Sequence, residues 1–148
     1  MKNKTKLVIA FILIAVLAAG LIAVAVNLNN QITTSTVSSL EYRIGGIDEE
    51  GTLDTDVVTS IVTKNYVTVD GLEIELNEDA KVTYQVFFYD EDREYVSASE
   101  ANLSTTFSGS VPETAKFCKI VIKPTIDPEV SWTEISKYAG MVTVTTNR

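Results

Sequence analysis

The sequence predicts an all-β fold, an antiparallel β-sandwich similar to a jelly roll, preceded by one apolar N-terminal segment. Three observations predict it. From Val37 onward, apolar residues recur at every second position, no window shows a helical 3.6-residue pattern, and turn-forming residues separate the apolar runs. About eight or nine strands joined by short turns, without crossover helices, are typical of two packed antiparallel sheets.

The candidate strands share this alternation of apolar and polar residues. They are expected at 37–44, 57–62, 66–69, 72–76, 81–89, 94–98, 103–109, 116–123 and 141–146. In 72–76 the leucines and the isoleucine should face the core, and both glutamates should face water. The Asp70-Gly71 pair between 66–69 and 72–76 predicts a two-residue hairpin that joins these two strands.

One short helical turn is expected within residues 128–138, where the strand pattern is interrupted. Ser131 is the expected N-cap, and Glu134, three residues later, would complete a capping box.

The N-terminus carries an apolar run at residues 7–26, preceded by three lysines and free of charged or polar side chains. Roughly 20 residues at about 1.5 Å of rise each are long enough to cross the hydrocarbon layer as a helix. Two interpretations stay open: an uncleaved single-pass anchor, and a secretory signal peptide cleaved after Ala25. In both cases the lysines hold the N-terminus in the cytoplasm, and the rest of the chain lies outside.

The chain therefore divides into three expected parts. Residues 1–26 form the membrane anchor or signal peptide, residues 27–36 a polar tether rich in Asn, Thr and Ser, and residues 37–148 an extracellular β-sandwich domain. The expected location is the cell membrane, or the exterior if the segment is removed.

The charge of the outer part argues against nucleic acid as a partner. After residue 26 the sequence has nine basic residues against twenty acidic ones. Binding to a phosphate backbone needs clustered Lys and Arg, and these basic residues are scattered along the sequence. The membrane is the one partner that the sequence indicates directly.

Cys118 is the only cysteine, so no intramolecular disulfide forms. Alternation in 116–123 places Cys118 on the same face as Ile120 and Ile122. We therefore expect a buried, unreactive thiol, because an apolar site lacks the charges that activate cysteine.

The residue types argue against an enzyme. The sequence has no histidine, which removes the commonest general base and the commonest zinc ligand, and it has no phosphate-binding glycine loop. Paired carboxylates could still support a small glycosidase or lyase, which is the least favoured alternative.

The segment 84–100 combines five aromatic residues with a run of acids. Phe87 and Tyr89 share one face of their strand, where they could stack on sugar rings or be covered by a loop or a second sheet. The acids should form the solvated tip of a hairpin. No cofactor is expected, and a structural calcium ion at Asp90 and Asp92 is the less favoured alternative.

Three further aromatic residues are candidates for ligand binding. Trp132 is the only tryptophan and lies in an irregular segment, where it could serve as a stacking platform alongside Tyr138 and Tyr66. The alternative is a tryptophan folded over the end of the core.

The order of motifs resembles a known family. Tyr89-Asp90 followed by Tyr95-Val96-Ser97, and then Pro112, Ala115, Phe117, Lys119 and Ile120, carry the resemblance over residues 84–123. These features resemble the jelly-roll domains of the carbohydrate-binding-module or galactose-binding-like type, found in surface and phage-encoded proteins of Gram-positive bacteria. The resemblance implies the fold more than a ligand, because the matching positions are structural.

The favoured function is a non-enzymatic binding module outside the cell, for carbohydrate or cell-envelope material. The alternative is a structural or protein-interaction subunit of a surface or phage-related assembly. A sugar binder should expose Trp132, or Phe87 and Tyr89, in a groove, whereas an interaction subunit should expose an apolar patch or a free sheet edge.

Overall fold

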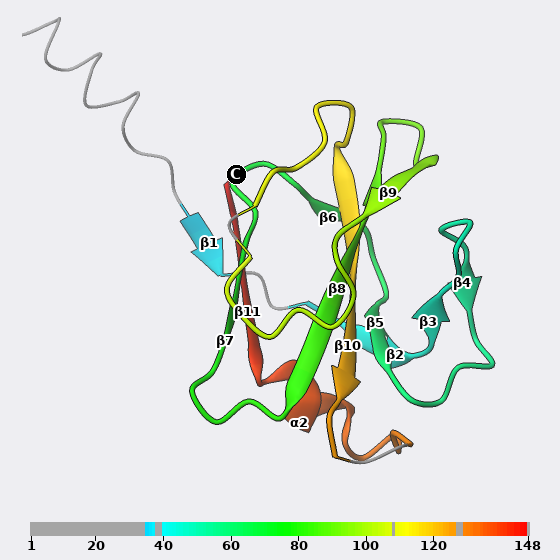
Figure 1. Cartoon of the computed structure of the whole chain (residues 1–148), viewed down its shortest axis with the longest axis vertical. Coiled ribbons are helices and arrows are strands. Elements are labelled where there is room, and N and C mark those ends of the chain that lie inside the picture. The colour runs from blue at the N-terminus through cyan, green and yellow to red at the C-terminus, as the bar shows by residue number, and fades with distance from the viewer. Residues whose placement is uncertain (1–34, 38–39, 108, 127–128, 148) are drawn as a thin grey trace, which may run out of the picture. The chain divides into compact units, whose positions relative to one another are not determined.

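The computed structural model describes residues 35–37, 40–107, 109–126 and 129–147 (Figure 1). The predicted anchor or signal peptide at 1–26 and the tether up to residue 34 lie outside these residues. Within the described ranges, no helix combines the length and apolar character needed to cross a membrane.

The described residues are mostly antiparallel β-structure, as the alternation predicts. The strands are β1 (Ser35–Val37), β2 (Tyr42–Ile44), β3 (Gly46–Ile47), β4 (Leu53–Asp54), β5 (Ile61–Thr63), β6 (Val67–Thr68), β7 (Glu73–Leu76), β8 (Val82–Tyr89), β9 (Tyr95–Ala98), β10 (Phe117–Pro124) and β11 (Val142–Asn147). One helix, α2 (Ile135–Ala139), precedes β11.

The strands form two main sheets and one hairpin. The large sheet has the order β2-β5-β10-β8-β9, and β6 also pairs with β10. The small sheet has the order β1-β11-β7, and β3 pairs with β4 to make the β3–β4 hairpin. The long strands β8 and β10 run side by side through the middle of the large sheet (Figure 1).

One hydrophobic core lies between the two main sheets. The large sheet contributes alternate residues of β8 and β10, among them Tyr84 and Ile120, and the small sheet contributes Ile74 and Val144. These four side chains are at most 3% exposed. Cys118 is fully buried in the same core, as expected, and burial raises the pKa of its thiol to about 12.

The other face of the large sheet, which we call the outer face, is also partly covered. Val62, Phe87 and Tyr89 are buried there, apart from the main core. The β3–β4 hairpin supplies part of the cover, because the Tyr89 hydroxyl donates a hydrogen bond of 2.7 Å to the Gly51 carbonyl at its tip. Residues 45–56 lie between the candidate strands 37–44 and 57–62, and a hairpin folded onto the sheet was not predicted there.

The hairpin predicted at Asp70-Gly71 is wrong. Gly71 has the expected positive φ of 59°. The flanking strands nevertheless do not pair, because β6 joins β10 in the large sheet and β7 joins β11 in the small sheet. The turn chemistry was recognised correctly, and long-range pairing decides where the two strands go.

The candidate strand at 103–109 is replaced by a crossing segment. Leu103 forms an isolated bridge to Tyr84 of the large sheet, and Phe107 forms one to Ile74 of the small sheet. This segment therefore connects the edges of the two sheets, and it is too short at either edge to form a regular strand.

The helical turn exists, but it begins later than predicted. The helix starts at Ile135 with Glu134 as its N-cap, and no side-chain cap bond is formed. The carboxylate of Glu134 instead accepts hydrogen bonds from the backbone N–H and the hydroxyl of Ser131. Only the backward half of the predicted capping box is therefore formed.

Candidate functional site

A cavity of about 410 Å³ opens where three loops meet beside the outer face: the tip of the β3–β4 hairpin, the β8–β9 turn and the loop between β5 and β6. We call it the tyrosine pocket. Its lining includes Gly51, Tyr66, Tyr89, Arg93, Tyr95 and Lys119. Aromatic rings and charged groups thus meet in one hollow, which is the usual composition of a small-ligand site.

The rings of the pocket contact one another edge to face. The Tyr66 and Tyr89 centroids lie 5.0 Å apart at an interplanar angle of 82°. The Tyr89 and Tyr95 centroids lie 6.0 Å apart at 64°. Tyr89 is almost fully buried, whereas Tyr66 and Tyr95 are partly exposed. The rings that a ligand can reach are therefore those of Tyr66 and Tyr95, supported by Tyr89 from behind.

The β8–β9 hairpin places two of these rings together. Tyr89 pairs with Tyr95 across the hairpin, after a register shift between Phe88 and Tyr89. Gly51 packs against Tyr95, because a Cβ added to Gly51 would lie 2.3 Å from the Tyr95 Cγ atom. Gly51 also has a φ of 79°, so glycine is favoured there on both grounds.

Lys119 reaches the pocket from β10, at a point where the neighbouring strand is interrupted. The registers of β5 and β6 against β10 differ by two residues, which leaves a bulge near Lys64. The Lys119 Nζ atom donates hydrogen bonds of 3.0 Å to the carbonyls of Thr63 and Lys64, and lies 4.7 Å from the Tyr66 ring centroid. Burial, together with the charge of Arg43, lowers the pKa of Lys119.

Arg93 comes from the β8–β9 turn and stacks on the same aromatic group. It has a positive φ of 67°, and its guanidinium carbon lies 5.2 Å from the Tyr66 centroid and 5.9 Å from that of Phe117. Cation–π contacts of this kind hold a guanidinium in place without consuming its hydrogen-bond donors.

The carboxylate of Asp90 is occupied by the β8–β9 turn itself. One carboxylate oxygen of Asp90 accepts hydrogen bonds of 2.9 Å from the backbone N–H groups of Asp92 and Glu94. The predicted solvated hairpin tip is therefore present. In the part of the chain that the structure describes, no group of three or more acidic or cysteine side chains is placed to hold a metal ion, Asp90 and Asp92 included.

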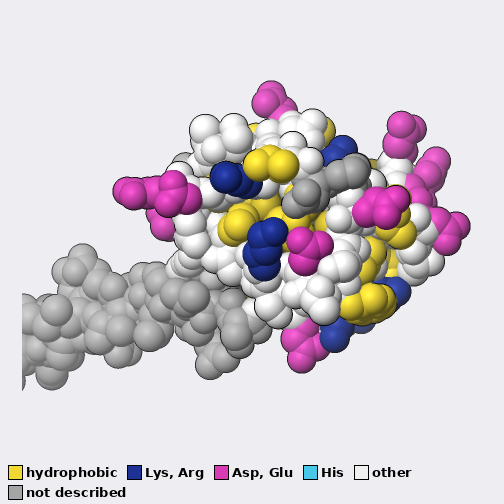
Figure 2. All heavy atoms as spheres, turned by 90° about the horizontal axis from the view of Figure 1, so that it is seen from below, with side chains coloured by type: hydrophobic (Ala, Val, Ile, Leu, Met, Phe, Trp, Pro, Cys, Tyr) yellow, Lys and Arg dark blue, Asp and Glu magenta, His cyan; other side chains and the backbone are white. Residues whose placement is uncertain are grey.

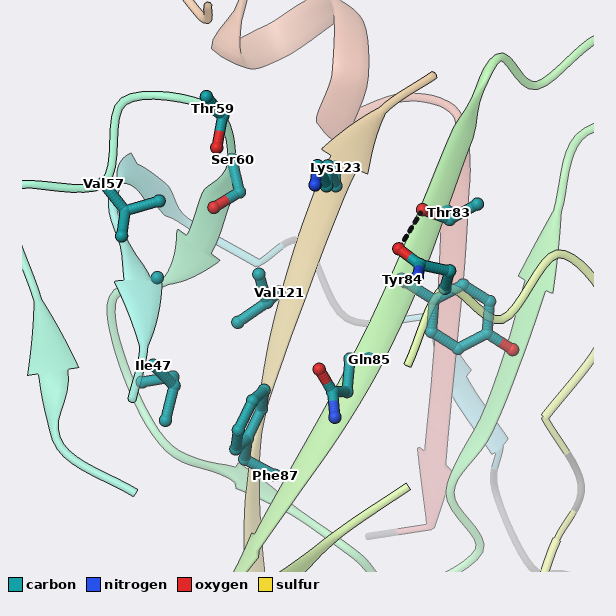
Figure 3. Close-up of a pocket in the computed structure, with 12 residues that line it drawn as sticks. Ile47, Val57, Thr59, Ser60, Thr83, Tyr84, Gln85, Phe87, Val121 and Lys123 are labelled. Atoms are coloured by element: carbon teal, nitrogen blue, oxygen red, sulfur yellow. Dashed lines mark hydrogen bonds between the residues drawn. The ribbon is translucent and has the colours of Figure 1, made fainter. Parts of the chain in front are cut away.

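Phe87 faces a second, smaller cavity of about 180 Å³ under the β3–β4 hairpin. In Figure 3, Ile47 and Val57 of the covering segment lie on one side of this space, and Val121 and Phe87 of the large sheet lie on the other. Phe87 is only 6% exposed, so it supports the cover and offers little ring surface to a ligand.

Helix α2, which includes Tyr138, lies at the end of the domain opposite the β8–β9 turn (Figure 1). Trp132 comes three residues before this helix in the sequence. Trp132 is 75% exposed, whereas Tyr138 is 2% exposed and packs into the core. The two residues do not form one stacking platform. The view toward this end shows hydrophobic side chains beside basic ones, with acids projecting around them (Figure 2).

The structure thus brings together two of the five predicted ligand-binding residues, Tyr66 and Tyr89. The sequence analysis did not select Arg93, Tyr95 or Lys119 as site residues. Lys119 carries a signal that could have found it, because a lysine flanked by Cys118 and Ile120 within a strand of mostly apolar residues is unusual. Arg93 likewise stands out as the single cation among the acids of its turn.

Comparison of the chain with protein-family models, curated proteins and solved structures finds no match. The resemblance to jelly-roll carbohydrate-binding domains therefore stays a prediction, and the function is argued from the site alone.

Proposed function

We propose that the chain is a non-enzymatic binding module that acts outside the cytoplasm and binds carbohydrate or cell-envelope material in the tyrosine pocket. In this proposal the two main sheets form a β-sandwich of jelly-roll type. The apolar segment at 7–26 either anchors the module in the membrane or directs its secretion.

The observation that carries the proposal is the set of tyrosine rings lining a hollow of about 410 Å³. The C–H faces of a sugar ring pack on aromatic side chains, and its hydroxyl groups need donors and acceptors close by. Tyr66 and Tyr95 supply partly exposed rings. Glu50 and Glu94, with Arg93, supply polar groups around them.

The alternative is a structural or protein-interaction subunit of a surface or phage-related assembly. It is favoured by the large apolar side chains exposed among the described residues, namely Val58 at 46%, Ile126 at 65% and Trp132 at 75%. The Val58 and Trp132 segments are adjacent, because the Val130 N–H donates a hydrogen bond to the Val58 carbonyl. Exposed apolar groups that lie together are typical of interaction surfaces.

A small glycosidase or lyase is the third alternative. Glu50 and Glu94 line the tyrosine pocket, and a pair of carboxylates is the minimum that glycoside hydrolysis needs. Release of reducing sugar from any glycan that the protein retains would favour this alternative over a binding module.

The test is retention of the protein on glycans. The full chain, kept in solution by a detergent without a sugar headgroup, is passed over purified bacterial cell walls and a panel of immobilised polysaccharides. Tyr66→Ala tests the pocket, and Trp132→Ala is the matched control at the other end of the domain.

We expect retention that Tyr66→Ala abolishes and Trp132→Ala leaves unchanged. Loss with Trp132→Ala alone would move the site to the α2 end. Absence of retention on every surface would overturn the proposal and favour the interaction subunit.

A further inference from the structure

Resting on the proposed carbohydrate-binding role, we infer that the sugar bound in the tyrosine pocket carries a carboxylate, as uronic acids and acidic amino sugars do. The inference comes from the placement of positive charge. The full sequence has 20 acidic residues and 12 basic ones, yet Lys119 and Arg93 both lie within 5.2 Å of the Tyr66 ring centroid. Arg43 adds a third positive charge close enough to affect the pKa of Lys119.

Lys119 is a buried cation that forms no ion pair with any carboxylate of the described residues. Lys119 is only 8% exposed. Its ammonium group donates hydrogen bonds to two carbonyl oxygens and contacts one aromatic ring. The ion pairs among the described residues are Lys64–Glu41 and Lys137–Glu134, and neither includes Lys119. A buried charge of this kind is costly unless it is paired, so an anion entering the pocket gains the interaction that the protein leaves unmade.

Arg93 is suited to receive the same anion. Its stacking on Tyr66 and Phe117 fixes the guanidinium plane, and it takes part in neither of the two ion pairs of the described residues. The N–H groups of a guanidinium form a planar fork that matches the two oxygens of a carboxylate. A carboxylate held by Arg93 would place the attached sugar ring against the tyrosines, and Lys119, which contacts the same Tyr66 ring, adds positive charge to the same hollow.

The acids of the pocket limit the total charge of the ligand. Glu50 and Glu94 are exposed and line the same hollow as the two cations. They can accept hydrogen bonds from sugar hydroxyl groups, and they repel a densely charged polyanion. The pocket therefore fits a sugar that carries one carboxylate and whose other substituents are uncharged, most of them hydroxyl groups.

The experiment compares acidic sugars with their neutral counterparts. The full chain, in the detergent described above, is titrated with D-glucuronate, D-galacturonate and N-acetylmuramate, and with D-glucose, D-galactose and N-acetylglucosamine, and binding is followed by saturation-transfer NMR and calorimetry. We expect at least one acidic sugar to bind about tenfold more tightly than its neutral partner at low salt, because one charge-assisted hydrogen bond contributes about that factor. Added salt should reduce the difference.

Three variants assign the preference to the cations. Arg93→Gln and Lys119→Met should each remove most of the preference for the acidic sugar while leaving the neutral sugar bound as before. Lys123→Gln, an exposed cation on the same strand β10, is the matched control and should change neither affinity. Because Lys119→Met removes two buried hydrogen bonds and can unfold the chain, Arg93→Gln, at an exposed turn residue, carries the test alone if necessary.

The outcomes separate this inference from the proposed function. Equal binding of acidic and neutral sugars, both lost in Tyr66→Ala, would overturn the carboxylate inference and keep the binding module. A preference that survives in Arg93→Gln would overturn the inference as well. Failure of every sugar to bind would overturn the carboxylate inference, and retention on cell walls and polysaccharides then decides the proposed function separately.

Discussion

The two faces of the large sheet are built from the same strands but carry different chemistry. On the inner face, β8 and β10 present alternate apolar side chains, such as Val86 and Ile120, to one closed core. On the outer face the same strands present Tyr89 and Lys119, and the cover there includes the short β3–β4 hairpin and leaves two cavities open. The difference indicates that the inner face holds the fold together, while the partly covered outer face carries the pocket in which we propose that a ligand binds.

The largest effect on the free energy of unfolding should come from a substitution on the inner face. Ile120 is fully buried, so Ile120→Ala leaves a cavity and should lower the free energy of unfolding by about 2–5 kcal/mol. Val121, the next residue of β10, borders the smaller outer cavity, and Val121→Ala should cost about 1 kcal/mol or less. Urea unfolding followed by circular dichroism measures both, and equal losses would contradict the distinction between the faces.

Alkaline pH should have the next largest effect on stability, through buried groups of the inner face. The thiol of Cys118 has its pKa raised from 9.0 to about 12, and the hydroxyls of Tyr42 and Tyr84 have theirs raised from 10.0 to about 12, in each case mainly by burial. A group whose pKa is higher in the folded chain stabilises the fold below its unfolded pKa, and this contribution is lost as the pH rises toward the folded value. Lys119 on the outer face has a lowered pKa, so its contribution to stability increases as the pH rises.

The contribution of the thiol should therefore be constant below about pH 9 and fall above it, by about 2 kcal/mol at pH 10.5. Urea midpoints at a series of pH values measure the fall. Cys118→Ala should delay its onset by about one pH unit, to the point where the tyrosines begin to ionise. An onset that the variant leaves at pH 9 would show that the buried thiol is not its cause.

A smaller effect on stability than that of Ile120→Ala should come from the outer cover. Gly51→Ala combines a φ of 79° with a clash against Tyr95, and should cost about 1–2 kcal/mol while loosening the hairpin tip over the tyrosine pocket. Gly140→Ala is the matched control, because Gly140 has an ordinary φ of −70°. Amide hydrogen exchange should rise near residues 48–52 only in Gly51→Ala, and exchange that spreads evenly through the core would argue against a separate cover.

The buried residues of the inner face were predictable, because the alternation of apolar residues along each strand determines them. Alternation in 81–89 and 116–123 identified the buried side chains, including Cys118, without knowledge of which strands pair. The hairpin expected at Asp70-Gly71 does not form, because distant strands, and not the local turn, decide the pairing. Turn preference is local, whereas the choice of β10 and β11 as partners depends on residues more than forty positions away in the sequence.

The candidate site was only half predictable. Tyr66 and Tyr89 could be selected as aromatic residues near turns, but their approach depends on a register shift in the large sheet and on a hairpin tip that folds over it. Lys119 depends on the bulge between β5 and β6, which supplies the carbonyl oxygens that hold its ammonium. A bulge forms where one strand has extra residues opposite its partner, and the composition of either strand alone does not reveal it.

The pairing of β1 with β11 determines how the domain responds to force. Tension applied to the chain ahead of residue 35 enters at β1, which is held by only three register pairs, from Ser35–Asn147 to Val37–Thr145. This strand should peel away first, and the load then reaches Leu40, which packs against the core, and Glu41, whose carbonyl accepts a hydrogen bond from the Lys64 N–H. The pairing of β11 with β7 and the whole large sheet should stay intact during this step. A pull on the N-terminal side thus breaks the β1 pairing before it reaches the large sheet or the tyrosine pocket.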